Sequence, residues 1–242
     1  MIPATDLARL FLGAGLLAFA SYTDWKWRRA PNLLWIVMLA AGLLLLAVDA
    51  VLRFPDVRAA WPYLLFAPAL VVAYYFLYQF GLIAGGADAK ALMALAVLAP
   101  FPIAYSTALP VFQSPFPGGV VVFVNALLAF LVIPLAYFLV NLARLDLDPM
   151  AFLGVRRRVQ DVDKGHYWLM ERVDDEGKVR RHYFASRAAY DLEEEKRKLL
   201  EKGVERVWVT PKVPFMIPLT IGFVLAFTVG DLLFGALAFL LG

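Results

Sequence analysis

The sequence predicts an all-α polytopic membrane protein, with about six transmembrane helices and a small soluble α/β cytoplasmic insert between helices five and six. Hydrophobic residues make up 62% of the 242 residues and charged residues only 18%, whereas about a quarter of a soluble domain is charged. Several apolar runs approach the roughly 20 residues that cross a bilayer as a helix. The charges concentrate elsewhere: residues 144–212 carry 16 Lys or Arg and 14 Asp or Glu.

The apolar runs set the expected helices in order. The first helix is predicted over 7–23; because Asp6 precedes Arg9 there is no basic leader region, so we expect this helix to be retained rather than cleaved. Pro31 and Asn32 restart the chain, since proline suits a first helical turn, and the second helix follows over 33–52. The remaining runs predict helices over 62–80, from the Gly85 turn to about 99–105, over 120–142 and over 215–241.

The charged stretch predicts a soluble insert over 143–212, between a membrane domain over 1–142 and a last membrane helix within 213–242. Residues 167–170 and 181–184 are expected to form two strands around the turn at 174–177. A charged helix is expected over 186–202 and ends at Gly203. A third strand is expected over 204–209.

The composition excludes several kinds of site. The chain has no cysteine, which excludes disulfides, cysteine nucleophiles, iron–sulfur clusters and cysteine-ligated zinc. The two histidines, His166 and His182, are too few for most metal sites and lie outside the apolar runs. We therefore expect no metal and no cofactor, and a net charge of +3 gives no reason to expect nucleic acid as a partner.

The basic residues of the first loop, Lys26, Arg28 and Arg29, place that loop in the cytoplasm by the positive-inside rule. With six helices, the Gly85 turn and the insert share that side, and both termini lie outside. Four acids lie in or beside the apolar helices: Asp24, Asp49, Asp88 and Asp231. Only Asp24 and Asp88 then fall at the same depth, at the cytoplasmic face, and we expect Asp49 and Asp231 to be structural.

The pairing of Asp24 with Asp88 suggests a catalytic carboxylate pair. Two nearby carboxyls share a proton and titrate together. One can act as general base on a water molecule while the other polarises the scissile carbonyl. Gly85 and Gly86 would permit unusual backbone angles and a close approach of substrate backbone. Because the two aspartates lie on different helices, we expect the pair to be open at rest and to close on substrate.

Simpler interpretations exist for each residue. Asp24 alone is compatible with an interfacial acid, and Asp88 alone with a helix N-cap. Lys90 is compatible with neutralising Asp88 or with reaching to lipid headgroups. A different class of function also remains: a small transporter or scaffold that uses Asp24 and Asp88 as ion or proton ligands. No internal repeat of the kind common in transporters is visible.

At these residues the sequence resembles the archaeal preflagellin and type IV prepilin peptidases, which are membrane aspartic proteases. Asp24 is followed by basic residues and by Pro31-Asn32, as in that family. Gly85-Gly86-Ala87-Asp88, followed by Lys90, is similar to the family's Gly-x-Gly-Asp motif, although Ala87 stands where the strict motif has glycine. The resemblance extends to Asn125, to the insert, and to Val213-Pro-Phe-Met before the last helix.

The resemblance implies an archaeal, multi-pass cell-membrane endopeptidase with Asp24 and Asp88 as its catalytic residues. Gly85, Gly86, Ala87, Lys90, Asn32 and Asn125 would bind substrate or support the motif. The implied partners are membrane lipid and archaellin or pilin-like precursors with a basic leader before an apolar helix, cut at the cytoplasmic face. The absence of cysteine argues against the methyltransferase activity of bacterial relatives. Presenilin-like cleavage within helices is the alternative protease function, but presenilin-type sequences usually have Tyr-Asp at the first aspartate, where Thr23 precedes Asp24 here.

Overall fold

The computed structural model describes residues 4–52, 54–83, 85–103, 112–162, 167–174, 176–183 and 191–241. The chain divides into two compact units. One comprises Met1–Phe130 and Pro214–Gly242, and the other comprises Leu131–Val213. Each unit is considered by itself below.

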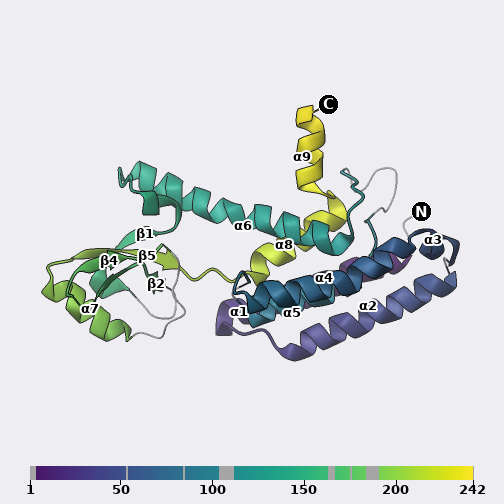
Figure 1. The fold of residues 1–242 in the computed structure, drawn as a ribbon, viewed down its shortest axis with the longest axis horizontal. Helices are drawn as coiled ribbons and strands as arrows, with labels where there is room; N and C mark the ends of the chain where they lie inside the picture. Colours follow the sequence, from purple (N-terminus) through teal and green to yellow (C-terminus); the bar gives the residue numbers. More distant parts are fainter. Residues whose placement is uncertain are drawn as a thin grey trace. The chain divides into compact units, whose positions relative to one another are not determined.

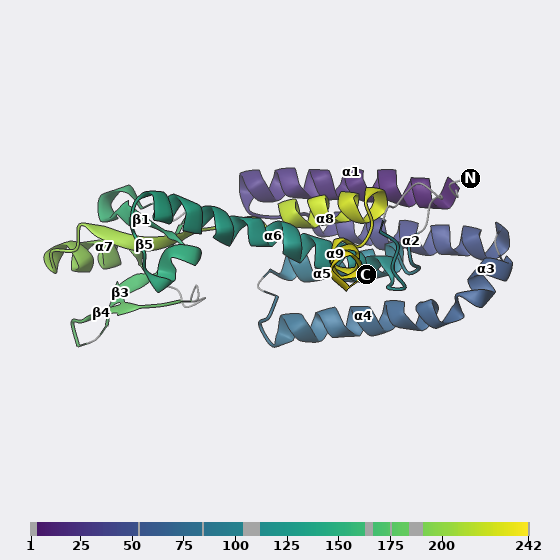
Figure 2. The same ribbon diagram turned by 90° about the horizontal axis from the view of Figure 1, so that it is seen from above.

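The first unit is helical (Figures 1 and 2). Its elements are α1 (Ala4–Trp27), α2 (Asn32–Leu52), α3 (Phe54–Ala59), α4 (Trp61–Gln79), α5 (Gly86–Leu98), the first half of α6 (Gly118–Ala143), α8 (Met216–Thr228) and α9 (Leu232–Leu241). Four of the described helices, α1, α2, α4 and α6, are long and apolar enough to cross a membrane. The others are shorter: α5 has 13 residues, which span about 20 Å at 1.5 Å per residue.

The short helix α5 forms the centre of this unit. Alanine and leucine side chains are buried around most of its circumference, and α2 and α4 pack against it. Gly42 lets α2 approach closely, because a Cβ there would lie 2.9 Å from the Cα of Leu98. Small side chains at a helix interface let backbones approach in this way. The result is a buried, well-packed helix that begins at the glycine turn and carries Asp88.

The expectation of one continuous helix over 215–241 is wrong. The helix breaks between α8 and α9, where Gly230 has φ +101°, a value that favours glycine. The backbone on both sides of the break is hydrogen-bonded to the backbone of Phe112. The Phe112 amide donates to the Val229 carbonyl, and the Asp231 amide donates to the Phe112 carbonyl, each at 2.9 Å. Figure 1 shows α9 leaving the direction of α8 after this break.

The second unit contains the C-terminal half of α6 and the charged insert. A three-stranded antiparallel sheet has the order β1 (Val155–Arg158), β5 (Arg206–Pro211), β2 (Tyr167–Leu169). A separate hairpin pairs β3 (Glu171–Val173) with β4 (Val179–Arg181). The helix α7 (Leu192–Glu201) packs its leucines on one face of the sheet, and two short 3₁₀ turns, Pro149–Phe152 and Val159–Asp161, flank β1.

The sequence located the turn at 174–177 correctly but paired the wrong strands. Residues 171–173, not 167–170, pair across that turn with β4, while β2 pairs with β5 far along the chain. The physical reason is the side-chain pattern: β2 contributes Leu169 to the core under α7, where its pairing partner Val209 of β5 is also buried. The predicted helix is seen as α7 and ends before Gly203, at φ +74°. Residues 186–190 of that prediction lie outside the described residues, as do Phe184 of the predicted strand and His166.

Candidate active site

Asp24 lies in the last turn of α1. The helix ends at Trp27, four residues after the expected end at Thr23. Its last backbone hydrogen bond runs from the Arg28 amide to the Asp24 carbonyl, at 2.9 Å. Arg28 then takes φ +54°, a left-handed conformation that commonly ends helices. The Asp24 side chain is half-buried, between the buried Thr23 and the exposed Trp25. It therefore lies where the helix leaves the packed interior.

Asp88 lies in the first turn of α5, but it is not the N-cap. The N-cap is Gly85, with extended backbone at φ −100° and ψ 129°, and Asp88 is the third residue of the helix. The Gly85 amide hydrogen-bonds the Asp88 carboxyl. An acid at this position that reaches back to the N-cap amide is one half of a capping box. The helix start thus holds the Asp88 carboxyl in a defined orientation.

The structure gives Gly85 a different role from the unusual backbone angles that were expected. Neither Gly85 nor Gly86 has a positive φ, so unusual backbone angles are not needed here. A Cβ at Gly85 would instead overlap the Oδ2 atom of Asp88. A Cβ at Gly86 would meet the Tyr78 hydroxyl at 3.4 Å, which is close to ordinary contact. The space above Gly85 is therefore occupied by the carboxyl group itself.

The structure brings Asp24 and Asp88 together. The helices that carry them, α1 and α5, are in contact, and the two carboxyls interact electrostatically. The Arg28 guanidinium also interacts electrostatically with Asp24. Two acids from helices far apart in the sequence thus lie at the same end of the bundle, near Arg28 and the C-terminus of α1.

Lys90 and Asn32 meet beside this pair. The Lys90 ammonium donates to the Asn32 side-chain oxygen at 2.8 Å. This contact joins the first residue of α2 to the first turn of α5. The partner of Lys90 in this contact is therefore neither Asp88 nor a lipid headgroup, the two that the simpler interpretations named. Ala87 is half-buried and packs against the core of the unit.

Asn125 does not join this group. Its carboxamide is buried and makes two hydrogen bonds at the break between α8 and α9. Its Nδ2 donates to the Gly230 carbonyl at 2.8 Å, and its Oδ1 accepts from the Leu232 amide at 3.2 Å. At that break Asp231 caps α9 by accepting from the Phe234 amide at 2.9 Å. Both residues stabilise an interrupted helix.

Sequence reasoning did not single out Tyr78. Its ring lies against Gly86, with the hydroxyl nearest to the glycine, and the side chain is 37% exposed. The signal was present, because an aromatic run ends α4 only a few residues before the glycine turn. Nothing in the sequence indicated that this residue folds back over the start of α5.

Asp49 belongs to a buried polar cluster at the other end of α5. Its carboxylate accepts from Arg9 at 2.6 Å and from the Thr5 hydroxyl at 2.7 Å. Arg9 also donates to Asp6 and to the Leu98 carbonyl, each at 2.9 Å. Such a cluster is expected for a charge that is buried with partners.

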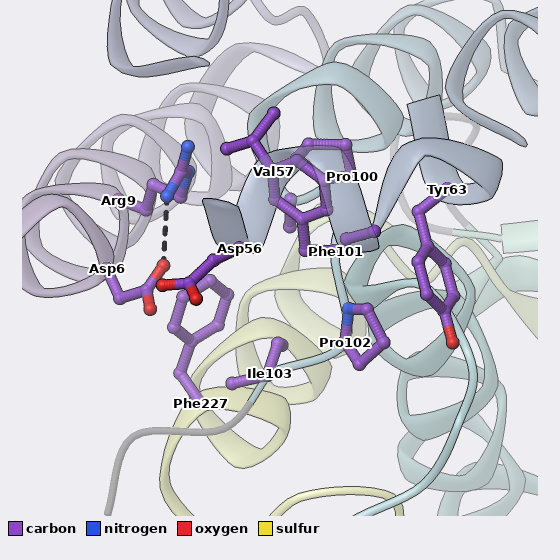
Figure 3. A pocket seen from close by; sticks show the side chains of 12 residues that line it. Asp6, Arg9, Asp56, Val57, Tyr63, Pro100, Phe101, Pro102, Ile103 and Phe227 are labelled. Carbon is purple, nitrogen blue, oxygen red and sulfur yellow. Dashed lines mark hydrogen bonds and ion pairs between the residues drawn. The ribbon is translucent and has the colours of Figure 1, made fainter. Parts of the chain in front are cut away.

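A cavity of about 260 Å³ adjoins this cluster (Figure 3). Asp6, Arg9 and Asp56 line one side of it, and Tyr63 lines the other. Residues 99–103, directly after α5, complete the lining. The cavity therefore lies at the end of α5 away from Asp88. Within the described ranges, no three His, Cys, Asp or Glu side chains converge as metal ligands would.

Two family models match the chain. The model of the type IV leader peptidase family matches residues 11–138, which include Asp24, Asp88 and the helices between them. The model for the archaeal peptidase A24 C-terminus, type II, matches residues 149–232. The second match covers the sheet, α7 and α8.

Two relatives cover nearly the whole chain. A preflagellin peptidase of Methanococcus voltae is 26% identical over 231 residues, covering 89% of this chain and 92% of the relative. A preflagellin peptidase of Methanocaldococcus jannaschii is 25% identical over 242 residues, covering 95% and 97%. Because the first family model spans more than half of the chain, this protein belongs to the type IV leader peptidase family and is a protease.

Proposed function

We propose that this protein is an aspartic endopeptidase that removes the leader peptide from preflagellin or type IV pilin-like precursors. The observation that carries the proposal is that Asp24 and Asp88 lie on contacting helices, α1 and α5, and that their carboxyls interact electrostatically. The two relatives named preflagellin peptidase support the substrate class. We place the reaction at the cytoplasmic membrane face, because Lys26, Arg28 and Arg29 follow Asp24 directly.

The chemistry follows from a pair that holds one proton. The ionised carboxylate takes a proton from a water molecule, whose oxygen attacks the scissile carbonyl carbon. The protonated carboxyl donates a hydrogen bond to the carbonyl oxygen as negative charge develops there. When the tetrahedral intermediate collapses, the C–N bond breaks and the leaving nitrogen takes a proton from the pair. One carboxylate and one carboxylic acid are then restored, so the pair again holds one proton.

The glycine turn positions the pair for this step. The hydrogen bond from the Gly85 amide fixes the Asp88 carboxyl, and Asp24 lies at a helix end where a peptide segment has access. A precursor with a basic leader before an apolar helix would orient by the positive-inside rule. Its cleavage site would then lie at the interface, at the depth proposed for both aspartates.

The test compares purified wild type with Asp24→Asn and Asp88→Asn in detergent or liposomes. The substrate is a precursor with a basic leader and an apolar helix, and its mass is measured before and after incubation. Asp146→Asn is the matched control, because it makes the same change at an acid of the insert, whose carboxylate lies 3.9 Å from Arg156. We expect wild type and the control to cut before the apolar segment and both active-site variants to be folded and inactive.

Cleavage by either aspartate variant would show that the pair is misassigned. A wild type that cuts no leader but cleaves within apolar helices would favour the presenilin-like alternative. A wild type that cuts neither substrate would favour a transporter or scaffold in which Asp24 and Asp88 hold an ion or a proton, and ion flux into liposomes would then be the measurement.

A further inference from the structure

The sheet of the second unit carries an unusual concentration of positive charge. Its three strands β1, β5 and β2 contain four arginines and no acid, and Lys212 follows β5 directly. The acids of the insert lie elsewhere, in α7, in the hairpin and in the loops. The insert as a whole is close to neutral, but the sheet strands carry basic residues and the acidic residues lie outside them.

Strand alternation places Arg156, Arg158 and Arg206 on one face of the sheet, whereas Arg157 points to the other face. Side chains two residues apart point to the same side of a sheet, and residues paired across strands share that side. Arg156 pairs with Trp208, Arg158 pairs with Arg206, and Trp168 pairs with Thr210. We call the surface formed by Arg156, Arg158, Arg206, Trp168, Trp208 and Lys212 the basic face. The opposite face holds the apolar cluster that α7 covers, with Arg157 exposed beside it over the Tyr167 ring.

The pair Arg158 and Arg206 is the unusual feature of the basic face. The two arginines are directly opposite each other on adjacent strands and both are exposed. Like charges in this arrangement are destabilising. In the described part of the chain, no ion pair involves either guanidinium. An external anion would relieve the repulsion that the sheet itself leaves uncompensated.

The other cations of the basic face lie over aromatic rings. The Lys212 ammonium is 4.1 Å from the centre of the Trp168 ring, and the Arg156 guanidinium is 5.2 Å from that of Trp208. Arg156 also lies 3.9 Å from an Asp146 oxygen. Trp208 is buried, so only the Trp168 ring of this face is partly exposed. A tryptophan beside basic side chains is typical of the membrane–water interface, where aromatic rings lie at headgroup level.

The basic face is also the one that packs towards an apolar helix of the same unit. Trp208 is buried with Met150 and Met170 in a cluster that includes Phe138 of α6. Phe138 stacks on Phe152 with ring centres 4.2 Å apart. Asn141 of α6 donates to the carbonyls of Ala151 and Gly154, at 2.9 and 2.7 Å. These contacts fix the sheet to the end of α6, with the basic face on the α6 side.

The half of α6 in this unit exposes a continuous apolar surface. Leu131, Val132, Leu135 and Leu139 are 53%, 62%, 49% and 63% exposed, and α6 is a candidate membrane span. The chain returns to the apolar helix α8 only a few residues after β5 ends at Pro211. Both connections hold the sheet within a short distance of hydrocarbon, and a basic cluster next to a membrane helix attracts anionic lipid.

We propose that the basic face, centred on Arg158 and Arg206, binds the anionic headgroups of membrane lipids. This function is independent of the carboxyl pair, and it would orient the insert against the bilayer. Lipid is favoured over a soluble anion because the face combines cations with tryptophan and is fixed to the end of a membrane helix.

The absence of cysteine allows a direct test. Thr210→Cys places one thiol on the basic face, in the full-length protein, and its reaction with uncharged N-ethylmaleimide is timed in nanodiscs. Phosphatidylglycerol discs are compared with phosphatidylcholine discs. Glu201→Cys, at the exposed end of α7 on the other side of the sheet, corrects for effects of surface charge on thiol reactivity. We expect the Thr210→Cys thiol to react at least threefold more slowly in anionic discs, relative to the control thiol.

Charge variants identify the residues responsible. Arg158→Gln with Arg206→Gln should remove the protection, whereas Arg197→Gln with Lys202→Gln on α7 changes the net charge equally and should retain it. Raised salt should weaken the protection, as expected for screened charges. Unchanged leader cleavage in detergent confirms that each variant is folded.

Equal labelling rates in the two lipids would overturn the proposal, as would protection that persists in the Arg158→Gln and Arg206→Gln variant. Protection in phosphatidylcholine discs on addition of inorganic phosphate would also overturn it, since the face would then bind a free anion rather than a headgroup.

Discussion

The Lys90 ammonium donates a 2.8 Å hydrogen bond to the side-chain oxygen of Asn32. The two residues belong to different sequence motifs, one after Asp88 and one after Asp24. Their contact connects α5 to the start of α2, which follows α1 by only a few residues. It is therefore a link between the segments that present the two aspartates.

Lys90→Met should lower the rate of leader cleavage at saturating substrate more than it changes KM. The link orients α5 but lies outside the carboxyl pair, so the effect is on positioning. Because Lys90 is exposed, the free energy of unfolding should change by no more than about 1 kcal/mol.

A double-mutant cycle with Asn32→Ala tests the link itself. If the bond matters, the double variant should be no slower than the worse single variant, since residues in direct contact are not additive. Fully additive losses in cleavage rate would contradict the prediction, and Lys90→Arg, which keeps a donor, is the conservative control.

Gly85→Ala should reduce cleavage at least tenfold while the protein stays folded. The added methyl would overlap the Asp88 carboxyl, so the carboxyl must move from its hydrogen bond with the Gly85 amide. Displacement of a catalytic group by about 1 Å commonly costs this much or more. Cleavage rate and thermal unfolding are the paired measurements.

Gly86→Ala is the matched control, because its methyl would meet the Tyr78 hydroxyl at 3.4 Å and needs little adjustment. Equal losses of activity in the two alanine variants would contradict the prediction. They would mean that activity depends on the conformation of the whole turn and not on the space that the Asp88 carboxyl occupies beside Gly85.

Arg9→Met should destabilise the protein by about 3–5 kcal/mol, the usual effect of breaking a buried ion pair by removing one partner. Arg9 is 2% exposed and contacts Asp49, Asp6 and the Leu98 carbonyl. The midpoint of thermal or denaturant unfolding in detergent measures the effect. Adding Asp49→Asn to the Arg9→Met variant should recover part of the lost stability, because it removes the buried carboxylate that Arg9 had paired with. If no stability is recovered, the loss comes from the contacts of Arg9 with Leu98 and Asp6 instead.

Asn125→Leu should destabilise the break between α8 and α9. The substitution leaves the buried Gly230 carbonyl and the Leu232 amide without their carboxamide partner, which costs about 1–3 kcal/mol for each group left unsatisfied. Protease nicking at the break and thermal unfolding report the change. Leader cleavage per folded molecule should be retained, because Asn125 does not contact Asp24 or Asp88; a folded but inactive variant would place Asn125 in the catalytic reaction.

Several features could be predicted from the sequence because they depend on local properties. The apolar runs predicted the long helices, since crossing hydrocarbon requires about 20 apolar residues whatever the neighbours are. The glycine turn before Asp88 and the glycine that ends α7 followed from backbone preferences. The charge distribution predicted a soluble insert over 143–212, whereas the compact unit that contains it begins at Leu131, within α6. The shared depth of Asp24 and Asp88 among four acids predicted them as a pair, and their catalytic role stays a prediction.

Other features were decided by contacts between distant segments. The break after α8 depends on Asn125 and Phe112, which supply hydrogen bonds to backbone that a continuous helix would satisfy itself. The pairing of β2 with β5 depends on which strands lie beside the core under α7. The space beside Gly85 is occupied because the Asp88 carboxyl folds back over it. Periodicity and composition describe what a segment buries, whereas only the tertiary structure determines which partner it is buried against.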